Sequence, residues 1–203
     1  MNRCPSNSPR MRLAILASGR GSHAANIIDR CAANELHAEV VLVASNNPGS
    51  GALGEAQRRG IATASISTQG DATTQDRNLC GLLSRYRPDW VITAGFLKKI
   101  GPETLSTFED HILNIHPSLL PAYGGQGMYG LNVHRAVLDA GETQTGATVH
   151  WVNAHYDEGA IVAQVNLPIP DHITTPEALA GALLPHEHQL LINVLKNIAS
   201  DHA

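Results

Sequence analysis

RLAILASGRGS, residues 12–22, is the stretch that decides the fold. Its first part, residues 12–17, is a short apolar run that ends in the glycine-rich residues 18–22. Apolar side chains at helical spacing follow over residues 25–32. A short apolar run is typical of a strand that is buried on both faces of a parallel sheet. The stretch therefore predicts a strand, a tight turn and a helix, which together form the first unit of an α/β fold.

The alternation of strand and helix continues along the first part of the chain. Further strands are predicted at residues 39–44, 61–66, 89–94 and 111–115, and further helices at residues 52–59 and 72–86. Because crossovers between parallel strands are right-handed, this order predicts a doubly wound, mainly parallel twisted sheet with helices on both faces. In such sheets, ligands bind beyond the carboxyl ends of the strands.

The last third of the chain departs from this alternation. Two strands are predicted at residues 146–153 and 160–167, and the short connection at residues 154–159 favours an antiparallel pair. Thr-Pro-Glu at residues 175–177 is typical of a helix start, with threonine as the N-cap. Pro185 lies inside this long helix and is expected to kink or restart it.

The composition indicates one domain that binds neither nucleic acid nor membrane. Of the 203 residues, 43% are hydrophobic, which supports a single domain over residues 11–203. Residues 1–10 are polar, so we expect a disordered extension rather than a signal peptide. A net charge of −4 and a pI near 6.2 argue against a basic nucleic-acid surface. No apolar run reaches the ~20 residues of a membrane span, so we expect a cytoplasmic protein. We expect it to act on small molecules, as a monomer or a homodimer.

Neither the cysteines nor the histidines predict a metal site. The three cysteines are odd in number and far apart, which fits a reducing compartment without disulfides. Eleven histidines are present, but none falls in an HExxH or similar spacing. His186 and His188 are two apart on a predicted helix and so point to different faces. His150 and His155 have no third ligand nearby in the sequence, so no metal is expected.

The glycine-rich residues 18–22 have two interpretations. Glycines let the backbone approach an anion, and the start of the following helix offers free N–H groups to a phosphate. The alternative is a tight turn with no ligand. The third glycine of a dinucleotide fingerprint and the Gly-Lys-Ser/Thr ending of a nucleotide loop are both missing, so both interpretations stay open.

The segment ILNIHPSLLP, residues 112–121, places an amide and an imidazole side by side. Side chains alternate along a strand, so Asn114 and His116 point to the same face, and Pro117 ends the strand. An amide N–H and an imidazole at the carboxyl end of a strand suit the stabilisation of an oxyanion and the movement of a proton. The alternative is that Asn114 and His116 only make structural hydrogen bonds to neighbouring groups at the end of the strand.

Asp157 lies in Tyr156-Asp157-Glu158-Gly159, between the two predicted antiparallel strands. An acid on this connection can reach His116, hold its charged form and raise its pKa. The alternative is a turn aspartate that serves its own backbone. The sequence does not place Asp157 relative to His116.

Residues 112–121 resemble the signature of the formyltransferase family that uses 10-formyltetrahydrofolate as co-substrate. Glu187 and His188 match an acid–histidine pair in the last helix of that family. The resemblance runs from about residue 12 to about residue 199 and is strongest to the branch that formylates glycinamide ribonucleotide in purine biosynthesis. Four further stretches are similar to the family, namely LAILASGRGS (13–22), TAGFLKKI (93–100), GGQGMYGLNV (124–133) and YDEGAIVAQ (156–164).

The resemblance implies the formyltransferase fold and direct acyl transfer through a tetrahedral intermediate, without a metal. His116 would be the catalytic histidine, Asn114 the oxyanion donor and Asp157 the acid that keeps the histidine protonated. The remaining implied roles concern substrate binding. The phosphate would contact Gly21, Ser22 and His23, the ribose Glu187, and the folate Leu97, Lys98, Lys99, Ile100 and Asn114.

Four residues depart from the family pattern. His23 replaces an asparagine that the family usually has in the phosphate loop, so phosphate binding is expected to become sensitive to pH. Ala72 stands where a basic residue often faces the glutamate tail of the folate, which should weaken tail binding. Pro185 and His186 lie beside Glu187 and put the geometry of the ribose contact in doubt.

Three rival functions are left open by the sequence. A formyltransferase that acts on a sugar nucleotide or on methionyl-tRNA shares the Asn-x-His core, as does formyltetrahydrofolate hydrolase. These relatives usually carry an additional domain, which we do not expect here. A non-catalytic nucleotide-binding module is disfavoured because Asn114, His116 and Asp157 occur together.

Overall fold

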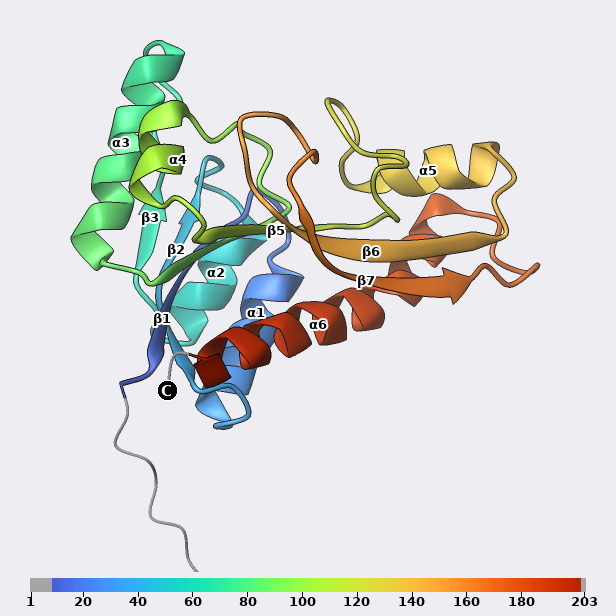
Figure 1. The fold of residues 1–203 in the computed structure, drawn as a ribbon, viewed down its shortest axis with the longest axis horizontal. Coiled ribbons are helices and arrows are strands. Elements are labelled where there is room, and N and C mark those ends of the chain that lie inside the picture. Colours follow the sequence, from blue (N-terminus) through green and yellow to red (C-terminus); the bar gives the residue numbers. More distant parts are fainter. Residues whose placement is uncertain (1–8, 202–203) are drawn as a thin grey trace, which may run out of the picture.

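A computed structural model describes residues 9–201, in which seven strands form one sheet flanked by helices (Figure 1). The strands are β1 (Met11–Leu16), β2 (Ala38–Ser45), β3 (Thr63–Ser65), β4 (Trp90–Ala94), β5 (Ile112–His116), β6 (Gln144–Trp151) and β7 (Ile161–Pro168). The helices are α1 (Ser22–Ala32), α2 (Gly51–Arg58), α3 (Ala72–Tyr86), α4 (Pro102–Thr107), α5 (Leu131–Asp139) and α6 (Pro176–Asp201).

The sheet has the order β3-β2-β1-β4-β5-β6-β7. Strands β1 to β5 pair in parallel, whereas β6 is antiparallel to β5, and β7 is antiparallel to β6. The chain moves outward from β1 to β3 and then returns to β4 on the other side of β1. At such a reversal, beyond the carboxyl ends of β1 and β4, open α/β sheets bind ligands. The predicted fold class, including its antiparallel strand pair, is confirmed.

Two apolar layers hold the helices to the sheet. One layer joins Leu13 and Ile15 of β1 to buried side chains of α1, α2 and α6. The other joins Ala14 and Leu16, on the opposite face of β1, to Leu79 and other side chains of α3. Figure 1 shows α3 and α4 on one side of the sheet and α1, α2 and α6 on the other. Both faces of the parallel strands are thus buried, which is why these strands read as continuous apolar runs.

Two helices, α4 and α5, were not predicted from the sequence. The start of α4 is capped by a residue from another helix. The buried carboxylate of Asp76 in α3 accepts hydrogen bonds from the backbone N–H groups of Glu103 and Thr104, at 2.8 and 3.2 Å. Gly101 leaves room for this carboxylate, because a Cβ there would lie 2.3 Å from Cγ of Asp76. A cap that comes from a distant helix leaves no local signal in the sequence.

Helix α6 corrects the prediction made for Pro185. The helix runs from Pro176 to Asp201 without interruption, with Pro185 inside it, so the predicted restart does not occur. A proline removes the hydrogen bond that its own nitrogen would donate, here toward Gly181, and its ring crowds that carbonyl. Buried side chains before and after the proline, including Leu183 and Leu191, pack in the same apolar layer, which stabilises the continuous helix.

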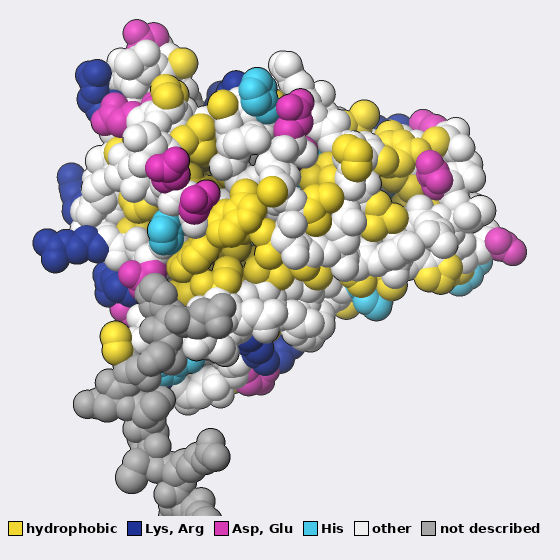
Figure 2. Space-filling view, in the orientation of Figure 1, with side chains coloured by type: hydrophobic (Ala, Val, Ile, Leu, Met, Phe, Trp, Pro, Cys, Tyr) yellow, Lys and Arg dark blue, Asp and Glu magenta, His cyan; other side chains and the backbone are white. Residues whose placement is uncertain are grey.

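Residues 1–8, most of the extension predicted to be disordered, lie outside the described residues. Within the described part, Arg10 donates a hydrogen bond to Asn34 at 2.5 Å. None of the helices in residues 9–201 is both long and apolar enough to cross a membrane. On the face drawn in Figure 2, Lys and Arg lie mainly near the margins, while apolar side chains form a band across the middle.

Candidate active site

The register of three strands places Thr93, Asn114 and His150 in one row across the sheet. Asn114 of β5 lies opposite Thr93 of β4 and opposite His150 of β6. The hydroxyl of Thr93 donates to Oδ1 of Asn114 at 2.7 Å, and Nδ2 of Asn114 lies 3.0 Å from Nε2 of His150. The amide of Asn114 is therefore oriented from both sides, with its N–H groups directed toward His150 and Asp157.

The structure brings Asp157 to both Asn114 and His116. Its Oδ2 lies 3.5 Å from Nδ1 of His116, and its Oδ1 lies 3.4 Å from Nδ2 of Asn114 and 3.5 Å from Nε2 of His150. The backbone N–H of Gly125 donates to Oδ2 at 2.9 Å. The three residues singled out as catalytic therefore converge, although His116 and Asp157 lie 41 positions apart in the sequence.

The surroundings of the two histidines determine where their protons lie. Nε2 of His116 lies 2.9 Å from the backbone oxygen of Tyr123, and a carbonyl only accepts, so Nε2 carries a proton. Nδ1 of neutral His116 is then an acceptor that faces a carboxylate oxygen, which fits their separation of 3.5 Å. By the same argument His150 holds its proton on Nδ1, which lies 2.8 Å from the backbone oxygen of Trp151. His150 can thus accept from Asn114.

The pKa of His116 lies below its ordinary value, although Asp157 raises it as expected. Burial lowers the pKa of His116 more than the nearby Asp157 and the Tyr123 carbonyl raise it. Burial raises the pKa of Asp157, but the contact with His150, the charge of His116 and the Gly125 N–H outweigh it, so that pKa is also lowered. With His116 neutral and Asp157 ionised, the pair has room for one more proton between Nδ1 and Oδ2.

The glycine-rich turn after β1 packs tightly against the start of α2. Gly21 is the N-cap of α1 and has a φ of 84°, a left-handed conformation that favours glycine. A Cβ on Gly21 would lie 2.4 Å from Cα of Ala52. The first-turn N–H groups of α1, including those of Ser22 and His23, have no partner within the helix. The turn thus has a packing reason for its glycine, and phosphate binding at the helix start remains a prediction.

His23 and Glu187, predicted to meet the phosphate and the ribose, meet each other in the structure. Nε2 of His23 lies 3.1 Å from Oε2 of Glu187, without the alignment of a hydrogen bond. The ring of His188 stands edge-on to that of His23, with centroids 4.8 Å apart. Burial and the charge of His23 lower the pKa of His188 to about 4, although Glu187 opposes this. Glu187 is 6% exposed, so a ribose must displace or share its contact with His23.

Four of the five predicted folate residues, all except Leu97, line a cavity of about 70 Å³. Ile100 forms part of its apolar wall with Phe96 and Val152, and Asp157 lies at its polar end. Its remaining lining comes from Thr93, Lys98, Lys99, Asn114, His150, Asn153, His155 and Tyr156.

Leu97 does not line this cavity. Its side chain is 46% exposed, and its backbone N–H donates to Oγ of Ser18 at 2.9 Å. That bond ties the loop after β4 to the loop after β1. At the mouth of the cavity, Nζ of Lys99 lies 6.0 Å from the ring centroid of Tyr156.

Sequence reasoning missed Thr93, His150 and Tyr123 as parts of the site. Thr93 and His150 enter through strand register, which the pattern of apolar residues does not fix. His150 is buried in the structure, with 2% of its surface exposed. The signal available in the sequence was a histidine within a predicted strand. Among residues 9–201, no group of three or more potential ligands is placed to hold a metal ion.

Comparisons with known proteins agree with this geometry. A family model described as formyl transferase matches residues 11–195. The chain is 37% identical over 195 residues to a chloroplastic phosphoribosylglycinamide formyltransferase of Arabidopsis thaliana, covering 95% of this chain and 66% of that protein. It is 36% identical over 161 residues to phosphoribosylglycinamide formyltransferase of Escherichia coli, covering 78% of this chain and 74% of that one.

The fold has relatives among solved structures. Glycinamide ribonucleotide transformylase 1 from Symbiobacterium toebii superposes with a TM-score of 0.88 at 31% identity, over 95% of this chain and 89% of that one. The chain spans 66% and 62% of the length of two plant relatives, from Arabidopsis thaliana and Vigna unguiculata. The similarity thus covers nearly all of this chain, though not all of those longer proteins.

Proposed function

The chain belongs to the formyl transferase family, and from this premise we propose that it transfers the formyl group of 10-formyltetrahydrofolate to the amine of glycinamide ribonucleotide, a step of purine biosynthesis. Relatives and structural neighbours that carry this activity in their names support the choice of acceptor. The observation that carries the proposal is the convergence of Asn114, His116 and Asp157 beyond the carboxyl end of β5.

Asn114 stabilises the oxygen of the formyl group as the carbon becomes tetrahedral. One N–H of its amide points to Nε2 of His150 at 3.0 Å, and the other makes a long contact of 3.4 Å with Asp157. The long contact is the weaker one, so the substrate oxygen can replace it at small cost. Because Thr93 and His150 hold the amide in place beforehand, the donor needs no reorganisation as the charge develops.

Asp157 and His116 together take the proton of the attacking amine. The amine nitrogen forms the new C–N bond and loses a proton, which enters the space between Oδ2 of Asp157 and Nδ1 of His116. Both groups have lowered pKa values, so the pair accepts this proton without first releasing one. The proton then passes to the folate nitrogen as its bond to the formyl carbon breaks, and the pair returns to its starting state.

The cavity beside Asn114 fits the reactive end of a folate in its chemistry. Its apolar walls suit an aromatic ring, and its polar end lies at Asn114 and Asp157. Ligand pockets for molecules of this size measure about 300–1,000 Å³, whereas the cavity measures about 70 Å³. We expect the cavity to widen on binding, with Tyr156 and Lys99 of its lining as the side chains that move. Tyr156 is 40% exposed and is free of core packing on that side.

The ribonucleotide lies beyond the carboxyl ends of β1 and β4 in this proposal. The start of α1 at Ser22 and His23 receives the phosphate, and Glu187 receives the ribose hydroxyls. Because His23 and Glu187 lie 3.1 Å apart in the substrate-free protein, binding separates them or makes them share the ligand. We also place the enzyme in the cytoplasm, because Cys31 and Cys80 are both free and buried.

An absorbance assay of folate release, with and without glycinamide ribonucleotide, tests the proposal. The expected result is release of the deformylated folate only when the ribonucleotide is present. Release without any acceptor would identify a hydrolase instead. Release only with a sugar nucleotide or methionyl-tRNA would keep the donor and the chemistry but change the acceptor.

A further inference from the structure

A three-residue segment of backbone, Tyr123 to Gly125, runs between His116 and Asp157. The carbonyl of Tyr123 lies 2.9 Å from Nε2 of His116, and the N–H of Gly125 lies 2.9 Å from Oδ2 of Asp157. Between them, Gly124 packs closely, because a Cβ there would lie 2.5 Å from Cδ2 of Leu120 and 3.1 Å from Cβ of Asp157. One short segment therefore contacts both members of the proton-accepting pair.

The two contacts have opposite chemical effects. The Tyr123 carbonyl requires a proton on Nε2 of His116, which leaves Nδ1 as the nitrogen that faces Asp157. The Gly125 N–H stabilises the ionised form of Asp157. Together they leave an unprotonated nitrogen and an ionised oxygen facing each other, which is the state that accepts a proton from the substrate.

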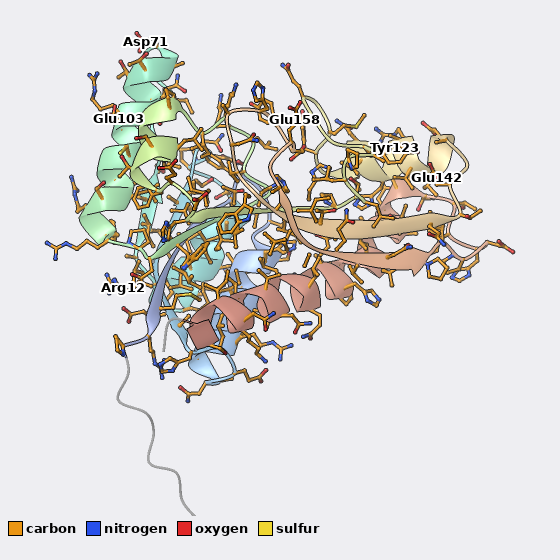
Figure 3. The ribbon with its side chains drawn as sticks, viewed as in Figure 1. Arg12, Asp71, Glu103, Tyr123, Glu142 and Glu158 are labelled. Carbon is orange, nitrogen blue, oxygen red and sulfur yellow. The ribbon has the colours of Figure 1, made fainter. Side chains whose placement is uncertain are left out.

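The segment is held by a side chain at some distance from the reacting atoms. The hydroxyl of Tyr123 donates to Oε1 of Glu142 at 2.7 Å, and Figure 3 shows these two residues side by side near α5. Tyr123 has a φ of 57°, in the left-handed region that non-glycine residues rarely adopt. A rare backbone conformation persists only where the surroundings hold it, and the bond to Glu142 is the contact that the tyrosine hydroxyl supplies.

We propose that Tyr123, anchored by Glu142, is a positioning residue that fixes which nitrogen of His116 faces Asp157. The proposal rests on the formyl transfer proposed above, in which that nitrogen shares the proton of the attacking amine. Neither Tyr123 nor Glu142 touches the reacting atoms. Their effect reaches the chemistry only through the Tyr123 carbonyl and the tautomer that it selects.

Several charged and titratable groups face His116, and an experiment must keep them constant. Asp157 faces it from the connection between β6 and β7, His150 from β6, His134 from α5 and Glu187 from α6. Tyr123 and Glu142 are distinct from all of these. A variant at Tyr123 or Glu142 therefore changes the hydrogen bond to Nε2 of His116 while leaving the charges around the ring in place.

The test compares Tyr123→Phe, Glu142→Ala and the double variant in the full chain. Tyr129→Phe is the matched control, since Tyr129 lies in the same loop and is 51% exposed. The first readout is the nitrogen NMR shift of the His116 ring in histidine-labelled protein, assigned with His116→Gln. The second is kcat and KM for both substrates. Glu142 is exposed, so Glu142→Ala keeps the test available if Tyr123→Phe does not fold.

In the wild type, we expect a single tautomer of His116 with the proton on Nε2. In Tyr123→Phe and in Glu142→Ala, we expect a mixture of tautomers and a kcat lowered by about two- to tenfold, the effect of one ordinary hydrogen bond. KM should change little, and the double variant should be no worse than either single variant, because both remove the same bond.

Two results would overturn the proposal. One is an unchanged tautomer in both Tyr123→Phe and Glu142→Ala. The other is an equal loss of kcat in the Tyr129→Phe control. The tautomer is measured without substrate, so it decides this proposal even if the wild type proves unable to transfer a formyl group. Failure of the wild type to transfer a formyl group would instead count against the proposed function.

Discussion

Replacing Asn114 with alanine removes the donor that we assign to the developing oxyanion. The amide is fixed by a 2.7 Å bond from Thr93 and a 3.0 Å contact with His150, so it is aligned before substrate binds. Loss of one pre-aligned oxyanion donor costs ~10²–10³ in rate, or ~2.7–4 kcal/mol of transition-state stabilisation. We therefore predict that kcat of Asn114→Ala falls within that range while KM for the ribonucleotide stays near that of the wild type.

Stability must be measured beside the rate, because the same substitution affects the fold. Alanine leaves Nε2 of buried His150 without its donor, which costs about 1–3 kcal/mol. Urea unfolding shows whether the protein is still folded under assay conditions. Thr93→Val is the matched control, because it keeps Asn114 but removes the hydroxyl that orients it. Its kcat should fall by about two- to tenfold. Near-normal turnover of Asn114→Ala at saturating substrates would refute the oxyanion assignment.

Three further predictions follow from other contacts. Asp157→Asn should lower kcat by ~10²–10⁴, because an amide cannot accept the proton that the carboxylate takes, while the fold is kept because the Gly125 N–H still finds an oxygen. The free energy of unfolding should fall as pH drops from 6.5 to 4, because in that window unfolded His188 binds a proton that the folded state, with a pKa of about 4, does not. Above pH 6.5 the contribution of neutral His188 to the free energy of unfolding is fully present. His188→Gln should reduce the loss of that free energy between pH 6.5 and 4 by on the order of 2 kcal/mol. Asp76→Ala should destabilise the protein by about 2–4 kcal/mol, measured by urea unfolding, because it removes the cap of α4 and leaves the buried N–H of Thr104 without its acceptor.

Each of these three predictions has a result that contradicts it. For Asp157→Asn, it is a kcat within a few-fold of the wild type. For His188, it is a pH dependence of unfolding that is the same in His188→Gln as in the wild type. For Asp76, the same destabilisation in Asp71→Ala would contradict it, because Asp71 caps only its own exposed helix end.

The sequence was sufficient to predict the sheet because its parallel strands are buried on both faces. Such strands appear as short apolar runs, and the glycine turn after β1 marks the first strand–helix junction. The antiparallel pair was also predictable, since the connection between β6 and β7 is short. Helix α4 was missed: Pro102 and Glu103 mark its first turn, but its cap comes from Asp76 in another helix. Helix α6 continues through Pro185, with buried side chains on both sides of the proline in one apolar layer.

The site was predictable as a set of residue types but not as a network. Alternation along β5 placed Asn114 and His116 on one face, and the resemblance suggested Asp157 as their partner. The register that brings Thr93 and His150 to Asn114 depends on three strands pairing at once, which no local pattern encodes. The direction of the pKa change of His116 also needed the structure. Burial of the ring lowers this pKa and nearby Asp157 raises it, and only the structure shows that burial has the larger effect.

The oxyanion assignment is best tested by a crystal structure with a bound analogue of the tetrahedral intermediate. We expect the oxygen that stands for the oxyanion to lie about 2.7–3.1 Å from Nδ2 of Asn114, the range for a productive oxyanion contact. We also expect the nitrogen of the attacking group to face Asp157 and His116. The assignment would be contradicted by an analogue whose oxygen lies away from Asn114 and whose attacking and departing nitrogens both lie out of contact with Asp157.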